Sequence, residues 1–203
     1  MSLAHRMRQS ICDTFEKVGA LAPTNCEGWQ AQDLAAHLWV RDRRPDTLPG
    51  IGLKAFAGHT ERIQRDKLHE LGFKRLVDDV RNPPLPVRLL GDLGNGSEYA
   101  IHLFDVARPN GIEVELSEAD ERALLPSVRM FSRKAAAEFG GRLVVTPSVG
   151  TSFAQGSGTR PVHLSGAPSE ILYFCSGRVD HADVELTGET ETVEALRSSI
   201  RGL

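Results

Sequence analysis

The spacing of apolar residues changes near residue 140, and this change constrains the fold of the chain more than any other sequence feature. Before that point, apolar residues recur every three or four positions, which is the period of a helix with one buried face. The first stripe of this kind consists of Leu3, Met7, Ile11, Phe15 and Val18. Further helices are expected over residues 30–44, 60–80, 95–108 and 117–139, with Gly72 as a candidate break in the 60–80 helix. Residues 82–86 (NPPLP) cannot form the interior of a helix.

After residue 140 the expected elements are short and of mixed type. Residues 142–147 (RLVVTP) are rich in β-branched side chains and predict a strand. Residues 149–160 hold three glycines and predict a turn or a mobile loop. The remaining elements are strands over 161–164 and 182–186 and helices over 168–175 and 189–201. Helices followed by a mixed segment predict an α+β protein with a helical domain over 1–140 and a small α/β domain over 141–203.

Composition and charge exclude several classes of protein. Apolar residues make up 40% and charged residues 25%, as in a globular protein, and the net charge is −3. A dedicated nucleic-acid binder usually carries a basic domain, so neither nucleic acid nor a membrane is expected as a partner. The N-terminus lacks the apolar segment of a signal peptide, and three scattered cysteines fit a reducing compartment. A cytoplasmic monomer or homodimer is expected.

The residues that carry chemistry centre on the sequence from Glu98 to His102 (EYAIH). Residues four apart on a helix share one face, with Cβ atoms about 5–6 Å apart. A carboxylate and an imidazole at this spacing can hold one metal ion together. On a charged helix, however, the same spacing more often marks a surface pair. Asp105 is three residues further on, and it would act either as an additional ligand or as a partner that fixes the tautomer of His102.

His37 makes a metal site more plausible. It lies in an apolar helical context, where the commoner role is a core histidine bonded to a neighbour. If it joins Glu98 and His102, the three ligands leave a fourth position open, which is the arrangement of a catalytic zinc site. The set predicted to bind one divalent ion is therefore His37, Glu98 and His102, with zinc expected first and nickel or iron as alternatives.

Three arginines are candidates for binding an acidic substrate. Arg41 and Arg44 belong to a basic run at the end of the second predicted helix, where positive charge is also favourable for the helix itself. Arg178 follows a glycine in the second domain, where a surface turn is the competing interpretation. Cys26 has no neighbouring base in sequence and is not expected to be a nucleophile.

Three segments carry a resemblance to a known family. They are the N-terminal motifs CEGW (26–29) and DLAAH (33–37), the segment NGSEYAIHLFD (95–105), and the C-terminal GAPSE (166–170) with LTG (186–188). In this order they resemble actinobacterial proteins related to mycothiol-dependent maleylpyruvate isomerase, within the wider DinB-like metal-binding proteins. The resemblance implies a four-helix bundle followed by a domain similar to sterol carriers.

The resemblance also implies a chemistry. The metal ligands of the family would fall on His37, Glu98 and His102, the family metal is usually zinc, and the thiol is mycothiol. The implied function is a thiol-dependent transferase or isomerase acting on a small electrophilic or acidic substrate. Close relatives carry a polar HxED pattern where this chain has Leu103 and Phe104, so the surroundings of the metal differ. A binding protein without turnover is the alternative.

Overall fold

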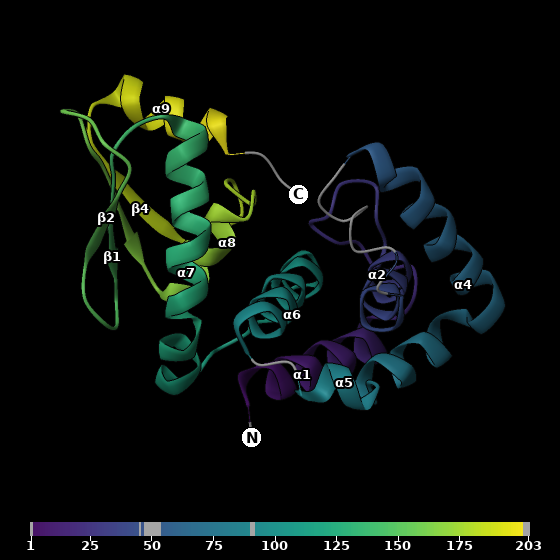
Figure 1. Ribbon diagram of the computed structural model, residues 1–203. Helices are drawn as coiled ribbons and strands as arrows, with labels where there is room; N and C mark the ends of the chain where they lie inside the picture. Colours follow the sequence, from purple (N-terminus) through teal and green to yellow (C-terminus); the bar gives the residue numbers. More distant parts are fainter. Residues whose placement is uncertain (1, 45, 47–53, 90–91, 201–203) are drawn as a thin grey trace. The chain divides into compact units, whose positions relative to one another are not determined.

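The computed structural model describes residues 2–44, 46, 54–89 and 92–200, and it divides into two compact units, Met1–Val114 and Glu115–Leu203 (Figure 1). The sequence predicted the boundary between the two domains near residue 140 instead. The difference lies in helix α7 (Glu118–Phe139), which packs against the other helices and strands of the C-terminal unit. Its apolar face therefore completes the core of that unit.

The described part of the N-terminal unit is helical. Its elements are α1 (Leu3–Val18), α2 (Ala31–Arg43), α4 (Lys54–Arg81), α5 (Leu85–Leu89), α6 (Asp92–Ala107) and the 3-10 turn η2 (Arg108–Asn110). Helix α1 contacts α2, α4 and α6, and α2 packs along α4. The contacts of α1 bring α2 and α6 into one core, and these two helices carry the candidate ligands.

Local side-chain chemistry fixes where α1 and α2 begin. The Asp92 carboxylate accepts hydrogen bonds from the backbone N–H groups of Leu3 and Ala4, at 3.1 and 2.8 Å, and so satisfies the free N-terminal donors of α1. At the start of α2, the Asp33 side chain accepts a hydrogen bond from the backbone N–H of Gln30 at 2.9 Å, as in a capping box. The predicted α1 stripe is buried from Leu3 to Phe15.

Two helices differ from the sequence prediction. Helix α4 begins at Lys54 rather than near residue 60, and it is interrupted at Gly72, whose φ of 72° lies in the left-handed region. The break at this glycine was predicted. Residues 82–86 were expected not to form the interior of a helix, and the short α5, which was not predicted, begins at Leu85. Its Pro86 is tolerated because it lies in the first turn, where a backbone N–H has no helical acceptor.

The C-terminal unit is a sheet with helices on one face. Its remaining elements are β1 (Leu143–Pro147), β2 (Phe153–Gln155), β3 (Val162–Gly166), α8 (Pro168–Cys175), β4 (Val184–Thr187) and α9 (Thr190–Ser199). The strand order is β2-β1-β3-β4, and only the β1–β3 pair is parallel. Val162 and Leu164 of β3 are buried while His163 between them is exposed, as expected for one covered and one open face.

Strand β2 is a correction, because residues 149–160 were predicted to be a turn or loop throughout. Phe153, Ala154 and Gln155 pair with β1 in antiparallel register instead. The guanidinium carbon of Arg129 on α7 lies 4.2 Å from the ring centroid of Phe153, and this cation–π contact holds the edge strand against α7. A strand of three residues between glycines has too few residues to show an alternating pattern in the sequence.

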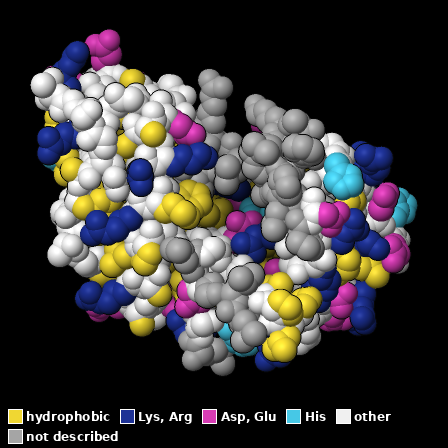
Figure 2. All heavy atoms as spheres, in the orientation of Figure 1, with side chains coloured by type: hydrophobic (Ala, Val, Ile, Leu, Met, Phe, Trp, Pro, Cys, Tyr) yellow, Lys and Arg dark blue, Asp and Glu magenta, His cyan; other side chains and the backbone are white. Residues whose placement is uncertain are grey.

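In the part of the chain that the structure describes, no helix combines the length and apolar character needed to cross a bilayer. Figure 2 shows Lys and Arg side chains interspersed with Asp and Glu side chains on the face drawn. Cys12, Cys26 and Cys175 are all in the reduced thiol form.

Candidate metal centre

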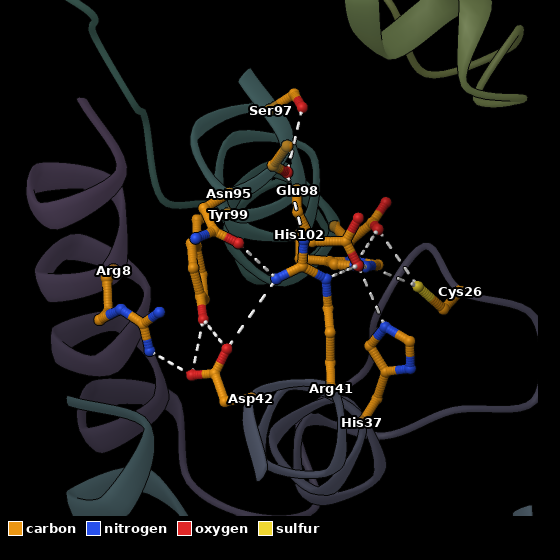
Figure 3. A network of polar contacts seen from close by, with 12 residues as sticks. Arg8, Cys26, His37, Arg41, Asp42, Asn95, Ser97, Glu98, Tyr99 and His102 are labelled. Atoms are coloured by element: carbon orange, nitrogen blue, oxygen red, sulfur yellow. Dashed lines mark hydrogen bonds and ion pairs between the residues drawn. The ribbon is translucent and has the colours of Figure 1, made fainter. Parts of the chain in front are cut away.

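The three predicted ligands converge inside the N-terminal unit (Figure 3). His37 comes from α2, and Glu98 and His102 come from successive turns of α6. Glu98 Oε1 lies 3.2 Å from His37 Nε2 and 3.3 Å from His102 Nε2. One ligand atom from each of the three residues lies within 4.8 Å of the others. A single point is therefore within reach of two imidazole nitrogens and one carboxylate oxygen.

The second nitrogen of each imidazole is also held. Gln64 of α4 places its Nε2 atom 3.1 Å from His37 Nδ1, and Asp105 places its Oδ2 atom 2.9 Å from His102 Nδ1. Gln64 and Asp105 are themselves buried. Asp105 is a partner of the kind that fixes the ring orientation and the tautomer of metal-binding histidines, and Gln64 holds the ring of His37 in place. Both rings are thus held with Nε2 directed at Glu98.

The bond to Asp105 determines where the proton of His102 lies. A carboxylate accepts a hydrogen bond, so the proton of a neutral His102 belongs on Nδ1 and the lone pair on Nε2. That lone pair then faces Glu98 Oε1 at 3.3 Å. Two lone pairs at this distance repel unless a cation lies between them. The cation is either a proton, which makes His102 an imidazolium, or a metal ion.

The distances fit a metal ion well. Zinc–nitrogen and zinc–oxygen bonds of about 2.0–2.1 Å in a tetrahedral arrangement place neighbouring ligand atoms about 3.3 Å apart. The two separations at Glu98 Oε1 are 3.2 and 3.3 Å. Charge-assisted hydrogen bonds between nitrogen and a carboxylate are shorter, at about 2.7–2.9 Å. The donor set and its spacing therefore suit one divalent ion.

In the metal-free protein, burial and hydrogen bonding shift the pKa values of His37, Glu98 and His102 in different directions. Burial lowers the pKa of His37, and its hydrogen bond to Glu98 opposes that shift. Burial acts against the charged form of His102 as well, but hydrogen bonds with Asp105, Cys26 and Glu98 raise its pKa well above the usual value. Burial acts to raise the pKa of Glu98, yet hydrogen bonds from both histidines hold it well below its usual range. These shifts favour an anionic Glu98 beside a cationic His102.

Glu98 is also the ligand that solvent reaches. Its side chain is 21% exposed, compared with 8% for His37 and 11% for His102. The indole of Trp29 lies against His37, with ring centroids 5.2 Å apart. The imidazole rings of His37 and His102 would shield an ion held here from solvent, and solvent would reach the ion from the side of Glu98.

Arg41 was predicted to bind an acidic substrate, and the structure places it at the centre. Its Nε atom lies 3.4 Å from Glu98 Oε1. Its Nη atoms donate hydrogen bonds to Asn95 Oδ1 at 2.9 Å and to the backbone oxygen of Gly94 at 3.2 Å (Figure 3). The guanidinium therefore orients Glu98 from α2, one turn after His37.

Arg44 and Arg178, the other two predicted arginines, make contacts within their own units. Arg44 forms a forked ion pair with Asp46 at 2.8 and 2.9 Å, near the surface. Arg178 lies in the C-terminal unit, where its Nη1 atom donates a hydrogen bond to the backbone oxygen of Ser176 at 2.9 Å. Its role toward a substrate stays a prediction. Asp105 lies on the Nδ1 side of His102, so it orients that ligand from outside the set around Glu98.

Sequence reasoning missed the position of Cys26. Its thiol donates a hydrogen bond to Asp105 Oδ2 at 3.2 Å and lies 4.0 Å from His102 Nδ1. No base is near Cys26 in the sequence, but the fold brings two polar groups to it from α6. Gln64 was missed for the same reason, since only the packing of α4 on α2 places it behind His37.

A buried ion pair joins the helices that carry the ligands. The guanidinium of Arg8 on α1 binds the Asp42 carboxylate on α2, and its Nη1 atom also donates a hydrogen bond to the backbone oxygen of Val80 on α4 at 2.7 Å. The Tyr99 hydroxyl on α6 donates to both oxygens of the same carboxylate at 2.9 Å. Since Tyr99 follows Glu98 directly, this network fixes α2 against α6 beside the candidate metal centre.

Comparison with known proteins gives a structural match alone. No protein-family model and no curated protein matches the chain. A crystal structure of the mycothiol-dependent maleylpyruvate isomerase matches with a TM-score of 0.59 and 18% identity, over 93% of this chain and 90% of that one. A histidine-to-alanine mutant of the isomerase matches with a TM-score of 0.55, the same identity and the same coverage. The α+β fold of this chain is therefore the fold of that isomerase.

Proposed function

We propose that the N-terminal unit binds one divalent metal ion through His37 Nε2, Glu98 Oε1 and His102 Nε2. Zinc is the first candidate because two imidazoles, one carboxylate and an open fourth position make up a catalytic zinc site. Nickel and iron accept the same donors. The observation that carries the proposal is the convergence of both Nε2 atoms on one carboxylate oxygen, at 3.2 and 3.3 Å.

We further propose that the chain is a thiol-dependent transferase or isomerase that acts on a small electrophilic or acidic substrate. The solved structures with this fold are named as mycothiol-dependent, which makes mycothiol the first thiol to test. A bound divalent ion with an open position would favour the thiolate form of such a thiol near neutral pH. The exposed side of Glu98 is where the thiol would enter.

Other residues of the chain would position the metal ligands and bind the substrate. Asp105 and Gln64 hold the two imidazoles in place, and Arg41 holds Glu98. Arg178 remains a candidate for binding an acidic substrate from the C-terminal unit. As part of the same proposal, the N-terminal helices form a DinB-like four-helix bundle and the C-terminal unit is related to sterol carriers. This interpretation is supported by the packing of α1 with α2, α4 and α6.

The alternative function is a protein that binds metal or a small ligand without turnover. The buried Leu103 and Phe104 follow His102 directly, so these positions lack the polar side chains that close relatives of the isomerase would carry there. This alternative predicts metal binding without any effect of an added thiol. The two functions therefore differ in one measurable property.

Metal content tests the first proposal. The purified protein should contain about one zinc, nickel or iron per chain by elemental analysis, and His102→Ala should lose it. His69→Ala is the matched control, because His69 is an exposed histidine on α4 of the same unit. Full metal content in the His102→Ala protein, measured beside the control, would contradict the assignment.

Cobalt substitution tests the thiol proposal. A thiolate bound to cobalt gives a charge-transfer band in the near ultraviolet. The titration uses Cys26→Ser protein, so that a new band can come only from the added thiol and not from the nearby cysteine. Mycothiol at millimolar concentration should produce the band. A spectrum that stays unchanged would favour the binding protein without turnover.

A further inference from the structure

Beyond the proposed metal centre, a second group of donor atoms meets on the opposite edge of the His102 ring. We propose that Cys26 Sγ, His102 Nδ1 and Asp105 Oδ2 form a second position for a divalent ion, and that this position contains a thiolate. It shares His102 with the first position but uses the other nitrogen. The ions that suit a sulfur, a nitrogen and an oxygen donor together are zinc, cobalt and cadmium, rather than magnesium or calcium.

The distances among the three donor atoms lie within about half an ångström of those that such an ion requires. Cys26 Sγ lies 3.2 Å from Asp105 Oδ2 and 4.0 Å from His102 Nδ1, and Nδ1 lies 2.9 Å from Oδ2. A tetrahedral zinc with bonds of about 2.3 Å to sulfur and about 2.0–2.1 Å to nitrogen and oxygen requires separations of about 3.3–3.6 Å. The observed values lie on both sides of that range, so shifts of a few tenths of an ångström complete the geometry.

The backbone around Cys26 is fixed in advance. The backbone N–H of Asn25 donates a hydrogen bond to the backbone oxygen of Asp105 at 2.9 Å, which attaches the loop between α1 and α2 to α6. The Cys26 N–H donates to Thr24 Oγ1 at 3.2 Å. The Asp105 and His102 side chains are buried, whereas Cys26 is partly exposed. An ion would therefore enter from the exposed side of Cys26 and reach the buried side chains of His102 and Asp105, which are already held in place.

The shared imidazole couples the two positions. A neutral His102 has one lone pair and one proton, so an ion at Nδ1 leaves the proton on Nε2, which then faces Glu98. An ion at Nε2 leaves the proton on Nδ1, which faces Asp105. Cys26 becomes a thiolate only when the ion is on the Nδ1 side, and its proton then goes to solvent. One chain should thus bind about one ion, at one position or the other.

Cobalt spectra of two variants separate the positions. His37→Ala removes a ligand of the first position only, so this protein should still bind cobalt and should show the thiolate charge-transfer band. Adding Cys26→Ser to it should remove the band and weaken cobalt binding at least tenfold. Cys175→Ala is the control for loss of a thiol, since Cys175 is buried in the other unit. A His37→Ala protein that binds cobalt without the band, or binds none, would overturn the proposal.

Alkylation tests the same proposal in the His37→Ala protein, in which the first position lacks one of its three ligands. Burial raises the pKa of both Cys12 and Cys175 to about 12, so Cys26 is the cysteine that iodoacetamide should modify first in the folded protein. Cadmium or zinc should slow alkylation of Cys26 at least tenfold, as measured by mass spectrometry of the peptide, and magnesium should not. Equal rates with and without cadmium would count against a thiolate ligand. Because His37 has no part in this position, this protection is expected even if the first centre binds no metal.

Discussion

Removing the Tyr99 hydroxyl tests whether the buried ion pair fixes the helices of the N-terminal unit. The hydroxyl is fully buried and donates to both oxygens of Asp42 at 2.9 Å. Burial and then the charge of Asp42 raise the pKa of Tyr99 well above its usual value, so the group remains a hydrogen-bond donor. Tyr99→Phe deletes one oxygen and leaves the ring in place.

The expected magnitude follows from the partners. A hydrogen bond to a charged group contributes about 1.5–3 kcal/mol, and in the variant the Asp42 carboxylate keeps its bond to Arg8. Tyr99→Phe should therefore lower the free energy of unfolding by about 1.5–3 kcal/mol. Asp42→Asn should cost more, about 3–5 kcal/mol, because it leaves the buried Arg8 guanidinium without its counter-charge.

Tryptophan fluorescence during urea unfolding is the assay. Both tryptophans of the chain, Trp29 and Trp39, lie in the N-terminal unit, so their emission reports on that unit. Tyr173→Phe makes the same chemical change at the other tyrosine of the chain, in the C-terminal unit, and is the matched control. The reasoning is refuted if Tyr99→Phe changes the free energy of unfolding by less than 0.5 kcal/mol, which is about the size of an ordinary surface substitution. It is also refuted if Asp42→Asn costs less than Tyr99→Phe.

Three further predictions concern the site and the sheet. Asp105→Asn should weaken zinc binding about 10–100-fold in a chelator competition, because the partner that orients His102 is changed; an affinity within twofold of the parent would contradict this. In the metal-free protein the raised pKa of His102 contributes stability that is complete below its unfolded value of about 6.5 and is lost as pH rises through the folded value. The urea midpoint should therefore fall above pH 6.5, and His102→Ala should flatten that dependence; a midpoint that rises with pH in the parent would refute the assignment. Gly156→Ala should destabilise the C-terminal unit by at least about 1–3 kcal/mol by circular dichroism, because φ is +70° and the added Cβ would lie 2.0 Å from the backbone oxygen of Gly141; an unchanged unfolding curve would show that this turn is not constrained.

The sequence was most informative where the relevant geometry is local. The apolar period predicted the helices because it is a property of consecutive residues, and the break at Gly72 follows from the residue itself. In the same way, Glu98 and His102 share a face because they are four apart on one helix. Strand β2 was missed because three residues are too few to show a period.

Only the tertiary structure decided which groups meet from distant parts of the chain. The sequence proposed His37 as a partner of Glu98, but the packing of α2, α4 and α6 set its distance and directed its Nε2 atom at that carboxylate. Cys26 and His102 are 76 positions apart, and no local pattern relates them. A period along the chain fixes which side of a helix a residue occupies, whereas the choice of its neighbour depends on how whole helices and loops pack, and that packing is determined by the burial of many side chains at once.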